Sequence, residues 1–325
     1  MKVKLWGVRG SLPAPLLPEQ QYQKSLTNLK QFHEALSTDP NISPEKFLNS
    51  LPSYMSKGFG GHTACIQVQT SEQNIIVDGG SGIRKLGEVL MCGPCGLGRG
   101  EVHILMTHFH WDHLIGLPFF VPLFIPGNKI HIYSVQDNAE ESVRTLFKKP
   151  NFPVPYEALG AEFIYHTLEP RKTVHFNDLK VTPYQLDHPD PCWGYKFEHN
   201  NKTFSYCVDT EGTRVSRKEL GEDLALYQNV DVMVFDAQYT FLEATEKVNW
   251  GHSSAPIGLD IAMREEIKKV YFVHHDPAAS DEKIMIAEKQ TRDYYKTRLK
   301  ALKQQEAEFS EVDWEFAIEG TEFEL

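Results

Sequence analysis

The feature that most constrains the fold of this chain is a Thr-His-Phe-His-Trp-Asp-His motif that directly follows the apolar run 102–106. The run predicts a buried β-strand. From the turn after such a strand, two histidines separated by one residue can point at one metal ion, and the Asp-His pair can reach a second ion beside it. Imidazole and carboxylate together suit zinc or another first-row divalent metal. The candidate ligands in this motif are His108, His110, Asp112 and His113.

Short β-patterned runs recur along the whole chain, and helical patterns fall between them rather than in a separate block. This mixture predicts one layered α/β domain over residues 1–325. The predicted strands cover 3–5, 65–69, 74–77, 102–106, 129–133, 162–165, 179–185, 203–208, 231–235, 270–273 and 314–317. The clearest helices are predicted at 83–90, 139–147 and 255–266, with a long C-terminal helix at 280–308 that has Ser280 as its N-cap.

Residues 18–57 interrupt this pattern, because they are polar and helical, with a helix start at Ser43-Pro44-Glu45. We interpret the segment as an inserted helical arm. It would line a substrate entrance, support a dimer contact or form a solvated excursion, and the sequence leaves these alternatives open.

The histidine motif resembles the signature of the metallo-β-lactamase superfamily, and the resemblance covers most of the chain. It implies the four-layer αβ/βα sandwich of that superfamily, and a site with two divalent metal ions. Zinc is the first choice, with manganese or iron as alternatives. The resemblance also implies further site residues after later strands. Asp78 would support the ligands from behind, His188 would complete the first metal site with His108 and His110, and Asp209 would bridge both metals.

The last ligand of the second metal site, beside Asp112 and His113, is one of two adjacent histidines after the predicted strand 270–273. Adjacent side chains on a strand point to opposite faces, so only one of them is expected to be a ligand. We favour His275, which lies in the turn, and keep His274 as the alternative.

A second motif indicates a branch of the superfamily. Phe-Asp-Ala-Gln-Tyr at 235–239 followed by Asn-Trp-Gly-His-Ser-Ser-Ala at 249–255 resembles the ribonuclease Z-like phosphodiesterases. In that branch the counterpart of His252 lies near the scissile phosphate and assists the leaving group, as a general acid does. We therefore name His252 as a catalytic residue, together with Asp112. An N-cap for the following helix is the alternative role of this segment.

The substrate class follows partly from charge and spacing. The chain has 44 acidic and 33 basic residues and a net charge of −11, which disfavours a long nucleic acid. In ribonuclease Z an RNA-gripping arm is inserted between the counterparts of His188 and Asp209, and the segment 189–208 is too short to hold it. We expect a small phosphodiester to be hydrolysed by a hydroxide bridging two metals, and the family resemblance implies a cyclic nucleotide as the leading choice. The alternatives are a nuclease on RNA or single-stranded DNA and a non-catalytic ligand sensor.

The cellular setting is expected to be the cytoplasm. The N-terminal sequence shows no export signal, and no apolar stretch is long enough to span a membrane. Five cysteines do not imply a disulfide framework. The Cys-Gly-Pro-Cys sequence at 92–95 copies a redox dithiol, but it follows a helical pattern, which favours a plain loop. A homodimer, joined through an amphipathic helix, is an open expectation.

Overall fold

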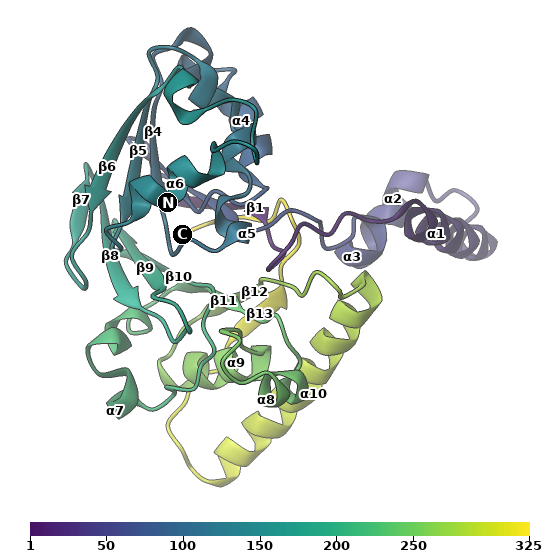
Figure 1. The fold of residues 1–325 in the computed structure, drawn as a ribbon. Coiled ribbons are helices and arrows are strands. Elements are labelled where there is room, and N and C mark those ends of the chain that lie inside the picture. The colour runs from purple at the N-terminus through teal and green to yellow at the C-terminus, as the bar shows by residue number, and fades with distance from the viewer.

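The computed structural model describes residues 1–325, and two seven-stranded mixed sheets form its centre (Figure 1). The first sheet has the order β14-β1-β2-β3-β4-β5-β6 and the second the order β13-β12-β11-β10-β9-β8-β7. The strands of the first sheet are β1 (Lys2–Gly7), β2 (Cys65–Gln69), β3 (Asn74–Val77), β4 (Glu101–Leu105), β5 (Lys129–Ser134), β6 (Glu162–Thr167) and β14 (Glu322–Glu324). Those of the second are β7 (Val174–Phe176), β8 (Leu179–Gln185), β9 (Trp193–His199), β10 (Lys202–Cys207), β11 (Val232–Asp236), β12 (Lys269–Val273) and β13 (Asp313–Phe316).

Three hydrophobic clusters fix the order of the layers. One cluster lies between the sheets and joins residues such as Val68 to Phe204. A second joins the outer face of the first sheet to its helices, and a third joins the second sheet to the remaining helices. The order helix, sheet, sheet, helix is the predicted four-layer sandwich, so the predicted fold class is confirmed.

Strand β4 shows how the sequence encodes these layers. Val102 and Ile104 face the helices of the first sheet, whereas Leu105 belongs to the cluster between the sheets. In β5, Ile130 and Tyr133 divide in the same way between these two clusters. Both faces of these parallel strands are covered, as expected for the interior of an α/β protein.

The helices match the predicted ones closely, with differences at their ends. The α-helices of the sandwich are α4 (Ile83–Leu90), α5 (Trp111–Leu114), α6 (Ala139–Leu146), α7 (Arg217–Leu220), α8 (Phe241–Glu246), α9 (Ala255–Arg264) and α10 (Asp281–Gln304). Short 3-10 segments are η1 (Pro94–Leu97), η2 (Leu117–Phe119), η3 (Val121–Phe124), η4 (Tyr156–Ala158) and η5 (Gly221–Leu226). The Ser280 side chain caps α10 by accepting from Lys283 N at 3.2 Å, as predicted. The helix ends four residues before the expected end at 308, and Glu306 has a left-handed φ of 52°. No helix in the chain is both long enough and apolar enough to cross a bilayer.

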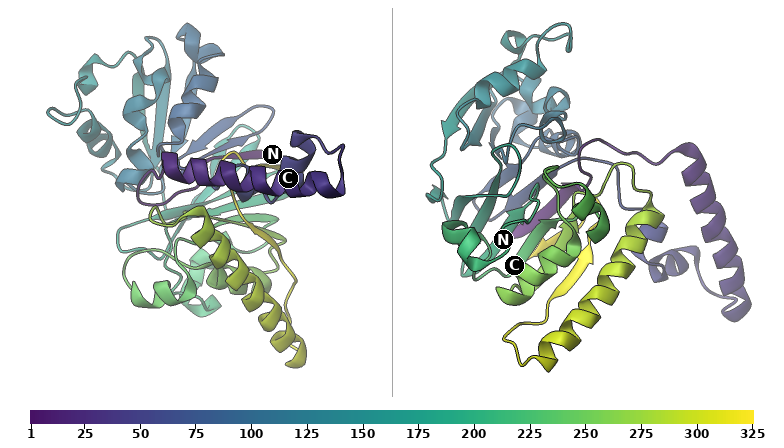
Figure 2. Two further views of the ribbon diagram at one scale, coloured as in Figure 1. Left: turned by 90° about the vertical axis from the view of Figure 1, so that its right-hand side faces the viewer. Right: turned by 60° about the horizontal axis from the view of Figure 1, so that its bottom comes forward.

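The predicted arm consists of α1 (Pro18–Thr38), α2 (Pro44–Ser50) and α3 (Ser53–Ser56), and it projects from the sandwich beside the start of α10 (Figures 1 and 2). Helix α1 has no buried residue. Lys24 ties the arm to the body, since its Nζ lies 3.0 Å from Asp281 Oδ2 and 2.6 Å from the Tyr54 carbonyl. A cleft of about 570 Å³ lies between α1, α3 and α10, and none of its lining residues is a predicted ligand.

The Cys-Gly-Pro-Cys sequence lies in a turn after α4, as the sequence indicated. Cys92 is exposed and Cys95 is buried in η1, and all five cysteines are free. A redox dithiol normally opens an α-helix that lowers its thiol pKa, whereas here burial raises the pKa of Cys95. The structure therefore favours a plain loop.

Candidate metal centre

The predicted ligands of the first metal site converge. His108 and His110 follow β4, and His188 follows β8. One nitrogen from each ring lies within 4.8 Å of the others. His108 is 1% exposed, whereas the His110 side chain is 44% exposed, so this end of the site opens to solvent.

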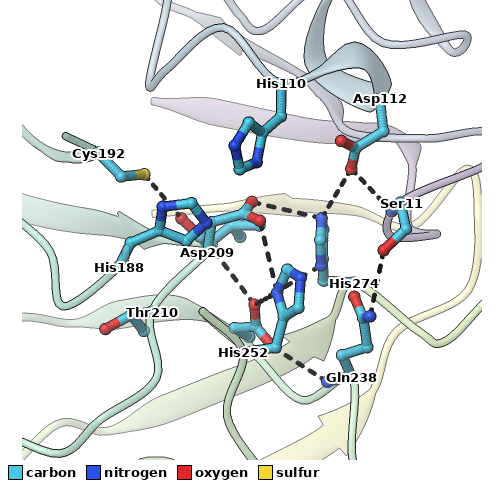
Figure 3. A network of polar contacts seen from close by, with 12 residues as sticks. Ser11, His110, Asp112, His188, Cys192, Asp209, Thr210, Gln238, His252 and His274 are labelled. Carbon is cyan, nitrogen blue, oxygen red and sulfur yellow. Dashed lines mark hydrogen bonds and ion pairs between the residues drawn. The ribbon is translucent and has the colours of Figure 1, made fainter. Parts of the chain in front are cut away.

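The predicted ligands of the second site lie beside them. His113 Nε2 lies 3.3 Å from Asp112 Oδ2 and 2.8 Å from Asp209 Oδ2. Asp209 also groups with His108 and His113, so its carboxylate lies between the two sets of ligands. Figure 3 shows this central position, with Asp209 between His188 and His274.

The structure corrects our choice between the two adjacent histidines. His274 Nε2 lies 3.2 Å from Asp112 Oδ2 and 3.3 Å from Asp209 Oδ2, inside the cluster. The ring of His275 points elsewhere: its Nε2 donates to the Ala317 carbonyl at 2.9 Å, and it stacks on Phe316. The reason is the backbone, because His274 directly follows β12 with a left-handed φ of 65°, which turns its side chain into the site.

Asp78 lies behind the ligands, where we expected it. Its Oδ2 is 2.8 Å from His113 Nδ1, and its carboxylate accepts hydrogen bonds from the backbone and hydroxyl of Thr107. A carboxylate that accepts from the far nitrogen of a ligating histidine fixes the ring and its tautomer.

His252 lies next to the same cluster, held by Asp236 of the 235–239 motif, to which the sequence analysis gave no role of its own. Its Nδ1 is 3.0 Å from Asp236 Oδ2 and 3.5 Å from Asp209 Oδ1. Asp236 ends β11, just as other site residues end or follow strands, and that position was the available signal. Ser254 is the N-cap residue of α9, yet its side chain makes no cap hydrogen bond, so helix capping does not explain this motif.

Two glycines allow the close packing around the site. A Cβ on Gly10 would lie 2.4 Å from His274 Nδ1, and one on Gly251 would lie 2.3 Å from His188 Cδ2. Gly251 also has a φ of +82°, which side chains other than glycine rarely adopt. The backbone at Gly10 and Gly251 therefore packs directly against the rings of His274 and His188.

The N-terminal loop reaches the second site, another contribution that the sequence analysis did not assign. The backbone N–H of Ser11 donates to Asp112 Oδ2 at 2.8 Å, and Gln238 Nε2 donates to Ser11 Oγ at 3.2 Å (Figure 3). Ser11 has a left-handed φ of 58°. The loop thereby holds the Asp112 carboxylate through the backbone of Ser11.

Asp190 contacts two ligands of the first site. Its Oδ2 lies 2.8 Å from His110 Nε2, which leaves Nδ1 of that ring for a metal. Its backbone N–H donates to His188 Nδ1 at 3.2 Å. Two separate ligand rings are therefore oriented by one residue of the loop after β8.

Charge and burial compete strongly in this cluster. Burial opposes ionisation of Asp209, but the neighbouring rings of His274, His113 and His108 hold its pKa well below the usual range. Burial also opposes protonation of His274, yet Asp209 and the hydrogen bond to Asp112 raise its pKa to about 9. The carboxylates thus attract positive charge into the centre.

The residues present fit divalent metal ions. Four ligand atoms, His108 Nε2, His113 Nε2, His188 Nε2 and Asp209 Oδ2, are buried without a well-formed hydrogen bond, although His113 Nε2 and Asp209 Oδ2 lie 2.8 Å apart. Such atoms are costly unless they find a partner, and converging nitrogen and oxygen donors are what first-row divalent ions bind. The donor set does not select one metal among them.

Comparison with known proteins identifies the family. A model of the β-lactamase superfamily domain matches residues 73–275, more than half of the chain. The chain belongs to the β-lactamase superfamily. The match covers the ligand motif, Asp78, His188, Asp209, His252 and His274, but not the arm or the loop of Ser11.

Curated relatives within this superfamily include ribonuclease Z proteins. That of Pyrococcus abyssi is 25% identical over 147 residues, covering 44% of this chain and 45% of the relative. That of Staphylococcus carnosus is 26% identical over 180 residues, covering 51% and 53%. The chain thus spans about half the length of the curated relatives it matches.

Several solved structures share the fold over 80–100% of the chain. A diphosphatase from the PhnP family has a TM-score of 0.58 at 16% identity, covering 100% of this chain and 97% of that one. The short form of human tRNase Z has a TM-score of 0.57 at 14% identity, covering 100% and 99%. Yeast PDE1 has a TM-score of 0.55 at 15% identity, covering 80% and 94%. At these identities the likeness shows the fold alone.

Proposed function

We propose that the protein is a metal-dependent phosphodiesterase that hydrolyses a small phosphodiester, with a cyclic nucleotide as the first candidate. The observation that carries this proposal is the position of Asp209. Its carboxylate belongs both to the group of His108 and His113 and to the group of His252 and His274. One buried carboxylate thereby joins a candidate metal-binding cluster to a candidate proton donor.

The proposed ligand sets are separate but adjacent. The first metal would be held by His108, His110 and His188, and the second by Asp112, His113 and His274, with Asp209 shared. When bound, two divalent ions would supply Lewis acidity toward a phosphoryl group and would activate water at neutral pH.

The chain's own contribution to the reaction is proton transfer and orientation. Asp236 holds His252 through Nδ1, which orients the ring and leaves Nε2 to donate a proton to the departing oxygen. Asp78 and Asp190 keep three ligand rings in place, since they bond to His113, His110 and His188. The site residues are buried on all sides except at His110 and His188, so a substrate enters there.

A small substrate is supported by the loop between His188 and Asp209. Strands β9 (Trp193–His199) and β10 (Lys202–Cys207) occupy most of it, and a gripping arm has no place there. The chain also has a net charge of −11, unfavourable for a long polyanion. The five free cysteines fit a reducing compartment, so we place the enzyme in the cytoplasm.

A nuclease acting on RNA or single-stranded DNA is the second candidate, because the curated relatives bear the name ribonuclease Z. The arm of α1–α3 would then grip the nucleic acid. Two of its four lysines already lie beside carboxylates, since Lys24 is 3.0 Å from Asp281 and Lys46 is 3.7 Å from Asp39. The arm therefore offers little free positive charge.

The test is turnover of 3′,5′- and 2′,3′-cyclic nucleotides by enzyme loaded with zinc or manganese, with a chelated control and with short RNA and DNA substrates in parallel. We expect chelator-sensitive release of nucleoside monophosphates. Turnover of nucleic acids alone would establish the second candidate instead.

His252→Ala should lower turnover roughly 100-fold or more on a diester with a poor leaving group. His33→Ala, which changes an exposed histidine on the arm, should leave turnover unchanged. Full turnover by His252→Ala would exclude the proposed proton donor.

A further inference from the structure

We propose that Trp111 and Trp250 form a stacking subsite for a nucleobase of the substrate, one indole on each side of the opening of the metal centre. The inference rests on the proposed phosphodiesterase function and names the chemical class of the group that the phosphodiester carries.

The exposure of these two residues separates them from the other tryptophans. Trp111 is 77% exposed and Trp250 is 63% exposed, whereas Trp193 and Trp314 are 7% and 8% exposed. A large apolar ring left in water gains nothing from folding, so two of them beside one site suggest a ligand.

Trp111 lies at the first-sheet side of the opening. It is the first residue of α5, between His110 and Asp112. The His110 side chain is 44% exposed, and that of Asp112 is 7% exposed. Trp111 therefore lies beside the ligand that marks the open end of the site.

Trp250 lies in the loop between α8 and α9. It precedes Gly251, whose backbone packs on the His188 ring so tightly that a Cβ would lie 2.3 Å from His188 Cδ2. The rings of His110 and His188 are only 4.9 Å apart between centroids. The backbones that carry the two indoles thus flank one pair of adjacent ligand rings.

A positive charge accompanies the second indole. Lys247 Nζ lies 5.7 Å from the centroid of the Trp250 ring and 4.0 Å from that of Tyr239. The Tyr239 ring in turn lies 5.8 Å from that of His252. Lys247 Nζ also lies 3.9 Å from Asp276 Oδ2, so its charge is partly neutralised, and the exposed indole is the group that a planar ligand would contact here.

A nucleobase fits this surface, because stacking on an indole needs only a flat π face and tolerates any base. The base could arrive on a free nucleotide or at the end of a nucleic acid strand, and the contact with the indoles would be the same. The two sources are separated by the test below.

The binding test uses metal-loaded protein and the fluorescence of its tryptophans. Adenosine monophosphate should quench the emission, and ribose 5-phosphate, which has no base, should not. Trp111→Leu and Trp250→Leu keep an apolar side chain but remove the π face, so each should raise the Kd for adenosine monophosphate about 10-fold. Trp250→Phe should restore much of the affinity. Tyr22→Leu, an exposed aromatic residue on α1, is the matched control. If the leucine variants raised the Kd for adenosine monophosphate and for ribose 5-phosphate equally, or raised neither, the proposed subsite would be wrong.

The turnover test compares cyclic adenosine monophosphate, a short oligoribonucleotide and glycerophosphocholine, a diester without a base. For the leucine variants, the ratio of kcat/KM for a base-bearing diester to that for glycerophosphocholine should fall about 10-fold, mainly through KM. A fall confined to the oligoribonucleotide assigns the base to a nucleic acid, and a fall for the cyclic nucleotide assigns it to a free nucleotide. An unchanged ratio would overturn the proposal. If the native enzyme hydrolysed no diester, the proposed function would fail, whereas the quenching by adenosine monophosphate would still report on the indoles.

Discussion

The His252 ring is held by Asp236, whose Oδ2 lies 3.0 Å from His252 Nδ1. Asp236 is itself fully buried and accepts backbone N–H groups from Asp209, Gln238 and Ser253. Backbone from three separate loops therefore fixes the carboxylate, and the carboxylate fixes the ring that we propose as the proton donor.

Asp236→Asn should weaken catalysis through His252. The amide can still accept hydrogen bonds at its oxygen, but it replaces one of the two acceptor oxygens that hold the His252 ring and the surrounding backbone. We expect kcat to fall at least about 10-fold for a diester with an alkoxide leaving group, and much less for one with 4-nitrophenolate, which leaves without a proton. Asp260→Asn, which affects a carboxylate on α9 bonded to Tyr294, is the control. Equal losses on both substrates would show that Asp236 acts only on the structure.

Asp190 gives a prediction about metal affinity. Because its carboxylate orients His110 and its backbone orients His188, Asp190→Asn should weaken only the first metal site. Affinity for one of two zinc equivalents should fall roughly 10- to 100-fold, measured by competition with a chromophoric chelator. Asp190→Glu should recover part of that loss. Equal weakening of both equivalents would contradict the assignment of Asp190 to one site.

Much of the site was predictable because its ligands come from short motifs at strand ends. The motif after β4 brings four candidates together within six residues, and Asp78 and Asp209 follow strands in the same manner. Parallel strands end at one edge of a sheet, so such residues gather there whatever the loops do.

The sequence analysis chose the wrong histidine and missed contacts of the site where the backbone conformation, or a loop distant in the sequence, determines where a side chain lies. Asp78, Asp209 and His274 all have left-handed φ values, 63°, 64° and 65°, directly after a strand or one residue later. The alternation of side chains along a strand does not extend into that conformation, so the sequence could not show which of the two histidines turns into the site, and the preference for the turn residue His275 was wrong. The contacts of Ser11 and Asp190 depend on loops folding over the site, and no local pattern encodes them.

His274 and His275 form a matched pair for testing the corrected ligand. His274→Ala should lose one metal equivalent, measured by elemental analysis after gel filtration, because it removes a nitrogen that lies within 3.3 Å of two carboxylates. His275→Phe should keep both equivalents, since its ring packs between Phe59 and Phe316, away from the site. That variant should instead lose about 1–3 kcal/mol of unfolding free energy, because the Ala317 carbonyl loses its donor. Loss of metal from His275→Phe would restore the original choice.

A histidine cluster far from the metal centre predicts the response of the fold to acid. His103, His131 and His166 stack on neighbouring strands β4, β5 and β6, with His131 Nδ1 only 2.9 Å from His166 Nε2. Burial lowers the pKa of His103 and of His166, and the charge of His131 lowers both further. A lowered pKa means that the unfolded chain takes up protons first, so stability is complete above about pH 6.5 and falls as the pH drops below that value.

We expect urea unfolding, measured with a chelator present, to show this fall between pH 7.5 and 5.5. His103→Phe should flatten it, and His33→Phe on the exposed arm should not. Parallel curves for His103→Phe and the native protein would exclude the cluster as the source of the acid sensitivity.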